Sequence, residues 1–437
     1  LLRDMSLEEK VGQLVHTLGW NYYEKDENGQ VRLTDLFRSD LKNRYIGCFW
    51  ATLRADPWTR KTLRTGLSPR EAAEMTNAMQ RYARDSTRLG IPLFLAEECP
   101  HGHMAIGTTV FPTAIGRAST WNTELEERVA EIVALEARLQ GGHIGYGPVL
   151  DVARELRWSR VEEGYGEDPF LSGSMGSAYV RGLQGGNVGS GENVIATLKH
   201  FTAYGVPEGG HNAGMAHVGV RELLTELSYP FEMAVKAGAL SLMTAYNEVD
   251  GIPCTANPFL TNQLLRDQWG FAGFVVSDLY SIDGLISQRV AASREEAGIL
   301  ALRSGVDSDL GGNCFSTDLV KACREGRLAE ADIDRAVSRI LRLKFKMGLF
   351  DNPYVKVKKA EKLIGTPGHR EVAREVARQS VVLLKNENQL LPLSKEVKRV
   401  AVIGPNADNV YNQLGDYTAP QAPGSVITVL EGIRQKL

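Results

Sequence analysis

The chain has 437 residues, which is too many for one ordinary domain. Lysine and arginine together number 50, aspartate and glutamate 53, and the formal net charge is −3 at pH 7. This near-neutral balance gives no electrostatic argument for binding nucleic acid or an anionic membrane. No run approaches the roughly eighteen apolar residues of a transmembrane helix. We therefore expect neither a nucleic acid nor a membrane among the partners.

Short apolar runs alternate with amphipathic stretches along most of the chain. The expected strands are 46–51, 92–98, 144–152, 194–201, 241–249, 273–278 and 305–310. Helical patterns between and after them cover 122–140, 221–237, 294–304 and 328–350. Continuous apolar strands alternating with helices predict a parallel sheet covered on both faces. Seven such units favour a (β/α)8-like TIM barrel over residues 1–350, in which the eighth strand is an extrapolation.

The pattern changes after residue 350. Two prolines and a basic run interrupt residues 351–371, and we predict a linker over 351–397 that includes a helical stretch. A strand over 398–408 and a helix over 426–437 then predict the beginning of an α/β sandwich domain, residues 398–437. One strand and one helix bury too little surface to form a core of their own. We expect a further C-terminal part of the protein, or a second chain, to complete this domain.

The five cysteines are odd in number and form no CxxC pair. The prediction is free and mostly buried thiols. Such thiols suit the cytoplasm, and they also suit a large periplasmic protein whose core needs no disulfide. The first residues, LLRDMSLEEK, contain neither an initiator methionine at position 1 nor a signal peptide, which fits a processed or trimmed form.

Polar side chains collect where the expected strands end. Glu98, Lys199 with His200, Tyr246 and Asp278 follow or terminate successive strands. The carboxyl ends of the strands form the active face of a parallel barrel, so we expect one pocket there. Neighbouring residues on a regular strand point to opposite faces. Lys199 and His200 can therefore share that pocket only if the strand is distorted between them.

The chemistry of these groups suits a sugar. Arg160, Lys199 and His200 are donors and Glu98 is an acceptor, a mixture that matches sugar hydroxyls. Apolar walls for sugar C–H faces are offered by Tyr246, Tyr280 and Trp158. Nearby cations favour the ionised form of Asp278. An ionised, desolvated carboxylate beside a sugar ring is the nucleophile of a retaining glycosidase.

The motifs EECPHGH, RELRWSRVEEGYGEDP, ATLKHFTAYG and GFVVSDLYSI, in this order, resemble glycoside hydrolase family 3. SVVLLKNENQLLPL and RVAVIGPNAD resemble the entry to the second domain of that family. The resemblance implies a retaining, exo-acting β-glycosidase without metal or organic cofactor. It implies that Asp278 is the nucleophile, and that Glu98, Arg160, Lys199, His200 and Tyr246 bind the substrate.

The chain departs from the family pattern at two places. Ser159 replaces a glycine beside Arg160, and Leu279 replaces the tryptophan that many members have after the nucleophile, with Tyr280 next. The acid/base residue of the family lies downstream of Leu437, so we assign none in this chain. We expect release of terminal non-reducing β-D-glucose from an oligosaccharide or β-glycoside, with a β-xylosidase as the alternative. We expect a periplasmic or secreted location.

Two functions of other classes remain to be weighed. The HxH of His101 and His103 is shared with metal-dependent amidohydrolases, but those enzymes need further histidines at later strand ends, and only His369 follows His217. A non-catalytic carbohydrate-binding protein would retain the pocket without an acid/base residue. Metal analysis and covalent labelling of Asp278 by a fluorinated sugar separate these alternatives from a glycosidase.

Overall fold

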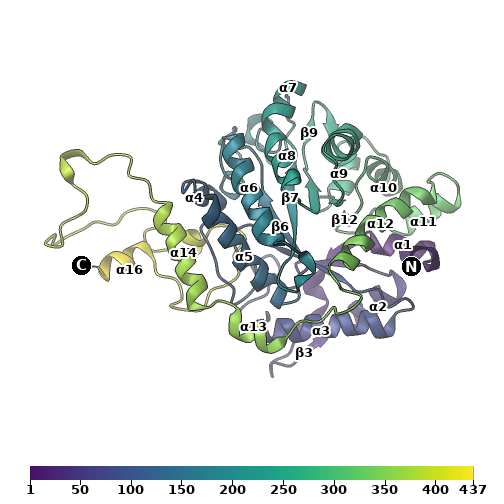
Figure 1. The fold of residues 1–437 in the computed structure, drawn as a ribbon, viewed down its shortest axis with the longest axis horizontal. Helices are drawn as coiled ribbons and strands as arrows, with labels where there is room; N and C mark the ends of the chain where they lie inside the picture. Colours follow the sequence, from purple (N-terminus) through teal and green to yellow (C-terminus); the bar gives the residue numbers. More distant parts are fainter. Residues whose placement is uncertain (437) are drawn as a thin grey trace.

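Residues 1–436 are described by a computed structural model (Figure 1). Eight parallel strands form one sheet in the order β11-β8-β7-β6-β5-β4-β1-β12. These strands are β1 Val15–Leu18, β4 Cys48–Trp50, β5 Phe94–Glu98, β6 Ile144–Val149, β7 Ile195–Phe201, β8 Ser241–Thr244, β11 Phe274–Val276 and β12 Asp309–Leu310.

The two ends of this sheet meet. Val276 in β11 pairs in parallel with Ser308, immediately before β12, and the Ser277 N–H donates to the Ser308 carbonyl at 2.9 Å. The sheet is therefore a nearly closed barrel, which confirms the predicted (β/α)8-like fold. The eighth strand is β1, whose sequence VHTL contains two polar residues and so lacks the continuous apolar run that identifies most of the others.

Helices surround the barrel (Figure 1). They are α1 Leu7–Gln13, α2 Asp35–Asn43, α3 Pro69–Ser86, α4 Ala114–Ala118, α5 Thr123–Leu139, α6 Pro169–Gln184, α7 Val220–Glu222, α8 Tyr229–Lys236, α9 Ser281–Ser287, α10 Arg294–Arg303, α11 Thr317–Arg324 and α12 Glu330–Lys346. Two π-helical segments, Leu223–Leu227 and Phe259–Gln268, and two small antiparallel pairs complete this part. The pairs are β2 Tyr23–Lys25 with β3 Val31–Leu33, and β9 Glu248–Val249 with β10 Ile252–Pro253.

Local sequence explains where the covering helices begin. Ser68 and Glu71 form a capping box at the start of α3, and Asn122 accepts a hydrogen bond from the Leu125 N–H at the start of α5. The helical stretch predicted over 221–237 is divided into α7, a π-helical turn and α8. Pro230, in the first turn of α8, has no N–H to continue the preceding helix.

The residues after the barrel pack back onto it. Helix α13 (Val357–Leu363) contributes Ala360 to a small buried cluster, together with Ile364, with Ala73 of α3 and Leu139 of α5. Helix α14 (Pro367–Gln379) follows, and His369 Nδ1 lies 2.7 Å from Glu136 Oε1 in α5. The stretch predicted as a linker therefore contains two helices that contact the barrel helices.

The predicted strand over 398–408 is not present. No strand follows Leu310 within residues 1–436, and the elements after α14 include helices α15 (Val410–Leu414) and α16 (Val429–Arg434). Leu384 is 91% exposed and Ile403 is 90% exposed. A strand requires a neighbouring strand for its backbone groups, and none of the described residues supplies one here. The predicted terminal helix is confirmed by α16.

Candidate active site

A cavity of about 230 Å³ opens at the carboxyl ends of the barrel strands. It is lined by Trp50, Arg54, Trp58, Glu98, Arg160, Lys199, His200, Met243, Tyr246, Asp278, Leu279, Leu310 and Tyr417. Six of the seven residues predicted for the site lie in this lining. The exception is Tyr280.

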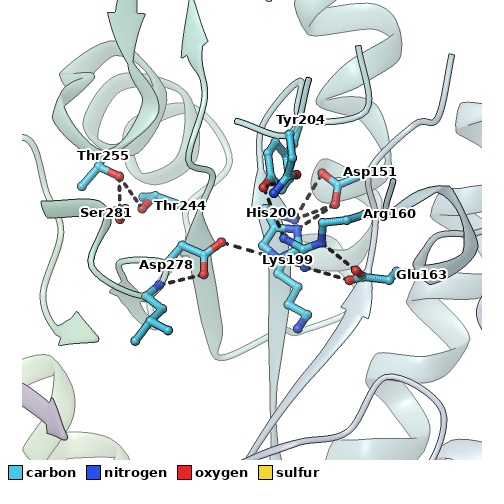
Figure 2. Close-up of polar contacts among 12 residues, drawn as sticks. Asp151, Arg160, Glu163, Lys199, His200, Tyr204, Thr244, Thr255, Asp278 and Ser281 are labelled. Carbon is cyan, nitrogen blue, oxygen red and sulfur yellow. Dashed lines mark hydrogen bonds and ion pairs between the residues drawn. The ribbon is translucent and has the colours of Figure 1, made fainter. Parts of the chain in front are cut away.

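Asp278 follows β11 and is buried. Its Oδ1 accepts a hydrogen bond from the Leu279 N–H at 2.7 Å. Its Oδ2 has no hydrogen-bond partner within residues 1–436 and lies 3.7 Å from His200 Nε2 (Figure 2). One carboxylate oxygen is therefore fixed by the backbone and the other is available to a reactant.

The charge state of Asp278 reflects two opposed effects. Burial raises the pKa of this carboxyl to about 6, while Arg160, the Leu279 N–H and Lys199 act to lower it. The predicted influence of the cations is present, but burial outweighs it. A pKa of about 6 leaves roughly nine tenths of the groups ionised at pH 7. Asp278 thus combines a negative charge with poor solvation.

His200 is fixed by partners on both ring nitrogens (Figure 2). Arg160 Nη2 lies 2.9 Å from His200 Nε2, and an arginine can only donate, so Nε2 is the acceptor. The proton is then on Nδ1, which donates to Asp151 Oδ2 at 2.8 Å. Burial lowers the pKa of His200 well below its usual value, and Arg160 adds to this effect. His200 is therefore neutral.

Arg160 connects most of the polar groups on one side of the cavity. It makes two parallel hydrogen bonds to Glu163, from Nε at 2.6 Å and from Nη2 at 2.8 Å. Its Nη1 donates to the Tyr204 hydroxyl at 3.3 Å. This bidentate pairing fixes the plane of the guanidinium and so the direction of its bond to His200.

Glu98, at the end of β5, is an acceptor for two donors. Trp50 Nε1–H donates to its Oε1 at 3.0 Å, and the Lys199 ammonium donates to its Oε2 at 2.9 Å. Burial opposes the charge of Lys199, yet Glu98 raises the pKa of Lys199 above its usual value. Glu98 and Lys199 therefore form a buried ion pair that can present hydrogen-bonding atoms to a sugar hydroxyl.

The predicted distortion of the strand at Lys199 and His200 is observed. The register between β7 and β8 shifts between Leu198 and Phe201, and the Lys199–His200 peptide bond is cis. Both side chains line the cavity, as the prediction required.

The segment around Tyr417, far beyond the barrel in sequence, forms part of the cavity. The Tyr417 hydroxyl accepts from Arg160 Nη2 at 3.1 Å, and the Lys199 ammonium lies 4.6 Å from the centre of the Tyr417 ring. The neighbouring Asp416 N–H donates to Glu162 Oε1 at 3.0 Å. The Asp416 carbonyl is hydrogen-bonded to the His101 ring.

Tyr280 is not brought to the cavity. It has a φ of 57° and stands at the start of α9, and its ring packs against Gly311, where a Cβ would collide with it. Trp158 is also outside the lining; it is buried, and its indole N–H donates to Asn212. Met243, which is not among the predicted site residues, is part of the lining.

Three lining residues between positions 50 and 58 were missed in the sequence, two tryptophans and an arginine. Trp50 and Trp58 pack together with ring centres 5.7 Å apart, and the Arg54 guanidinium lies 4.8 Å from the Trp58 ring centre. Trp50 ends the predicted strand 46–51, and its position at a strand end is the signal that would have identified it. Arg54 and Trp58 lie in the following loop, where the sequence gives no such signal.

Within residues 1–436 no group of three or more histidine, cysteine, aspartate or glutamate side chains is arranged to hold a metal ion. The two histidines of the HxH have different surroundings. His101 contacts the Phe111 and Asp416 carbonyls, and His103 lies 3.7 Å from the Glu97 carboxylate. None of the helices in the described part of the chain is both long and apolar enough to span a membrane.

Comparison with known protein families gives two matches. The glycosyl hydrolase family 3 N terminal domain matches residues 6–343, and the glycosyl hydrolase family 3 C-terminal domain matches residues 381–437. The chain belongs to glycoside hydrolase family 3. Its curated relatives include a periplasmic β-glucosidase of Salmonella typhimurium, 34% identical over 99% of this chain and 53% of the relative. A β-xylosidase of Formosa agariphila is 40% identical over 86% of this chain and 55% of the relative.

Solved structures of β-glucosidases agree with the fold. A β-glucosidase of Erythrobacter marinus superposes with a TM-score of 0.89 and 35% identity, over 99% of this chain and 55% of that one. A variant β-glucosidase of Listeria innocua in complex with laminaribiose gives a TM-score of 0.87 and 31% identity, over 100% and 58%. This chain therefore spans about half the length of the relatives that it matches. The curated relatives are divided between β-glucosidases and β-xylosidases.

Proposed function

We propose that the whole protein is an exo-acting, retaining β-glycosidase that forms a covalent glycosyl intermediate on Asp278. The observation that carries this proposal is the position of the Asp278 carboxylate, which is buried, lines the cavity and has one oxygen without a hydrogen-bond partner in the described residues. It faces a cavity lined by the donors Arg160 and Lys199 and by neutral His200, whose Nε2 is an acceptor. An anionic nucleophile among donors that hold a sugar is the arrangement needed for a double displacement.

In the proposed first step, Asp278 Oδ2 attacks the anomeric carbon of the terminal sugar. The bond from that carbon to the glycosidic oxygen breaks, and the leaving oxygen takes a proton from a general acid. In the second step, water attacks the anomeric carbon and releases Asp278 as a carboxylate, with its proton going to the conjugate base of the same acid. The sugar leaves with its original β configuration.

The general acid needs a separate source. The carboxylates that line the cavity are Asp278 and Glu98, and Glu98 is engaged by Trp50 and Lys199. We assign to Glu98 the role of gripping hydroxyls of the terminal sugar. We propose that the acid/base group comes from another part of the whole protein, within the second domain, or from a second chain. No metal or organic cofactor enters these steps.

The division of the chain follows from the same proposal. Residues 1–350 provide the barrel with the nucleophile, 351–397 connect the two domains, and 398–437 begin the second domain. The whole protein acts in the periplasm or outside the cell, by analogy with the periplasmic β-glucosidase from Salmonella typhimurium.

β-D-Glucose is our first candidate for the sugar, supported by the β-glucosidase relatives and the solved β-glucosidase structures. β-D-Xylose is the second, supported by the 40% identity to a β-xylosidase. The two sugars differ by a hydroxymethyl group. Hydrolysis of 4-nitrophenyl β-D-glucoside and β-D-xyloside by the full-length protein, compared by kcat/KM, decides between them.

A 2-deoxy-2-fluoro-β-glycosyl fluoride of the preferred sugar tests the mechanism. We expect one equivalent of label on the peptide that contains Asp278, and none in Asp278→Asn. Label on another carboxylate, or a product with inverted anomeric configuration, would exclude the proposed role of Asp278. Neither result would depend on which of the two sugars is preferred.

A further inference from the structure

A second cavity, of about 440 Å³, lies at the opposite face of the barrel from Asp278. Its walls come from the end of α5, the loop before β7 and the segment from the end of α12 into α13. The end of α5 leads into β6 and the loop 189–192 leads into β7, so the cavity lies at the amino ends of these strands. It is therefore separated from the proposed active site by the length of the barrel.

Arg138 lines this cavity and is only 3% exposed. Its Nε and Nη1 atoms are fully buried and have no hydrogen-bond partner within residues 1–436. The guanidinium makes no ion pair with any described residue, and its remaining nitrogen, Nη2, is the one that keeps solvent contact. A buried cation without a partner is unfavourable, and such a group calls for a ligand.

Another buried arginine shows how this chain normally satisfies such a group. Arg117, 1% exposed, donates from Nε to Glu126 at 2.8 Å and from its other nitrogens to the Pro112 and Pro100 carbonyls. Arg138 stands in the last turn of α5, where the helix dipole favours a cation, but it donates no hydrogen bond to the carbonyls there. The helix dipole favours the positive charge of Arg138 but provides no acceptor, so the N–H groups of Arg138 remain without hydrogen bonds.

Together with Arg138, the other charged residues give the cavity a net positive charge. Lys359 is paired with Glu192 at 3.1 Å, so these two charges compensate each other. Lys356 is exposed and forms no ion pair in the described part of the chain, and Asp351 is an exposed carboxylate at the edge. Because Nε and Nη1 are enclosed by the protein, Nη2 is the Arg138 nitrogen that can donate a charge-assisted hydrogen bond to an anion in the cavity.

We propose that this cavity binds a small oxyanion, a phosphate or carboxylate group, through Arg138, with Lys356 as a second positive charge. An oxygen of the ligand would accept a hydrogen bond from Arg138 Nη2, the guanidinium nitrogen that reaches the cavity, and its charge would balance that of the buried guanidinium. Such a site is distinct from the sugar pocket, and its existence does not depend on the proposed glycosidase activity.

Isothermal titration of the full-length protein with inorganic phosphate tests the proposal, at constant ionic strength maintained with sodium chloride. We expect saturable binding with one site per chain. Arg138→Gln should weaken it at least ~10-fold, the loss expected for a charged hydrogen bond. Lys356→Gln, at an exposed position that does not threaten folding, should weaken it several-fold. A parallel titration with acetate identifies whether the site prefers phosphate or carboxylate.

Lys358→Gln provides the matched control, because Lys358 is exposed in the same segment but does not line the cavity. It should bind phosphate as the wild type does. The proposal is overturned if neither anion binds saturably above the chloride background. It is also overturned if Lys358→Gln weakens binding as much as Lys356→Gln, because the effect would then be one of general surface charge.

Discussion

Replacing Asp278 by asparagine should stabilise the folded protein while abolishing turnover. In the folded state, burial raises the pKa of Asp278 from 3.8 to about 6. An acid whose pKa is raised by folding binds extra protons in the folded state between these values, so wild-type stability falls as the pH rises through this window. Above pH 6 the penalty is constant. The shift of about two units corresponds to roughly 3 kcal/mol, which Asp278→Asn would recover.

The free energy of unfolding, measured by urea denaturation of both proteins between pH 4 and pH 8, tests this reasoning. The variant should be about 3 kcal/mol more stable than the wild type at pH 8, and the difference should fall below ~1 kcal/mol at pH 4. Activity on aryl glycosides should drop by several powers of ten at every pH. This pattern would mark Asp278 as a group kept charged for function at the expense of stability.

Asp267→Asn is a suitable control, because Asp267 is exposed and makes no ion pair with the described residues. Its free energy of unfolding should stay close to that of the wild type. Equal stability of Asp278→Asn and the wild type at pH 8, or a difference that does not change with pH, would refute the account of burial given above.

Three further results are expected from the geometry of the pocket. On the acid side, kcat/KM for aryl β-glycosides should fall about tenfold per pH unit below about pH 6, because protonated Asp278 is not a nucleophile; a flat profile down to pH 5 would contradict this. Glu98→Gln should lower kcat/KM about 100-fold, because Lys199 loses its charged partner. Unchanged values of KM and kcat in this variant would exclude Glu98 from substrate binding. Tyr417→Phe retains the ring over Lys199 and loses only the acceptor for Arg160, so it should reduce kcat/KM several-fold. Tyr417→Ala also removes the ring and should reduce kcat/KM at least ~10-fold more. Equal effects of the two variants would argue against a role for the ring.

The barrel could be predicted because burial on both faces makes most of its strands continuous apolar runs. The same regularity located much of the site: a polar residue at the end of a parallel strand must lie near the mouth of the barrel, and Glu98, Lys199 and Asp278 obey this rule. Strand β1 was not predicted because His16 and Thr17 interrupt its run of apolar residues. His16 is nevertheless buried, where its Nδ1 lies 3.0 Å from the Tyr146 hydroxyl.

The sequence could not show where side chains outside the strands point. Tyr280 is two residues from Asp278, yet its left-handed backbone conformation directs the ring onto Gly311. Trp58 is far from any strand end, and only the folding of its loop brings it beside Trp50. The apolar pattern over 398–408 does suit a strand, but a strand depends on partners, and a local pattern contains no information about whether they are present.

The contacts of Tyr417 show that two parts of the chain build the pocket, the barrel and the segment around residue 417. Arg160 donates to the Tyr417 hydroxyl and to His200 with the same Nη2 atom, and His200 Nε2 lies 3.7 Å from Asp278 Oδ2. The position of the segment around residue 417 is thereby connected to the nucleophile through one shared donor. Glu162 and His101 of the barrel hold the adjacent Asp416 backbone, so this segment is placed by the barrel rather than by its own fold. The barrel thus holds Asp416 and Tyr417, which lie in the part matched by the C-terminal domain of the family, at its own active face.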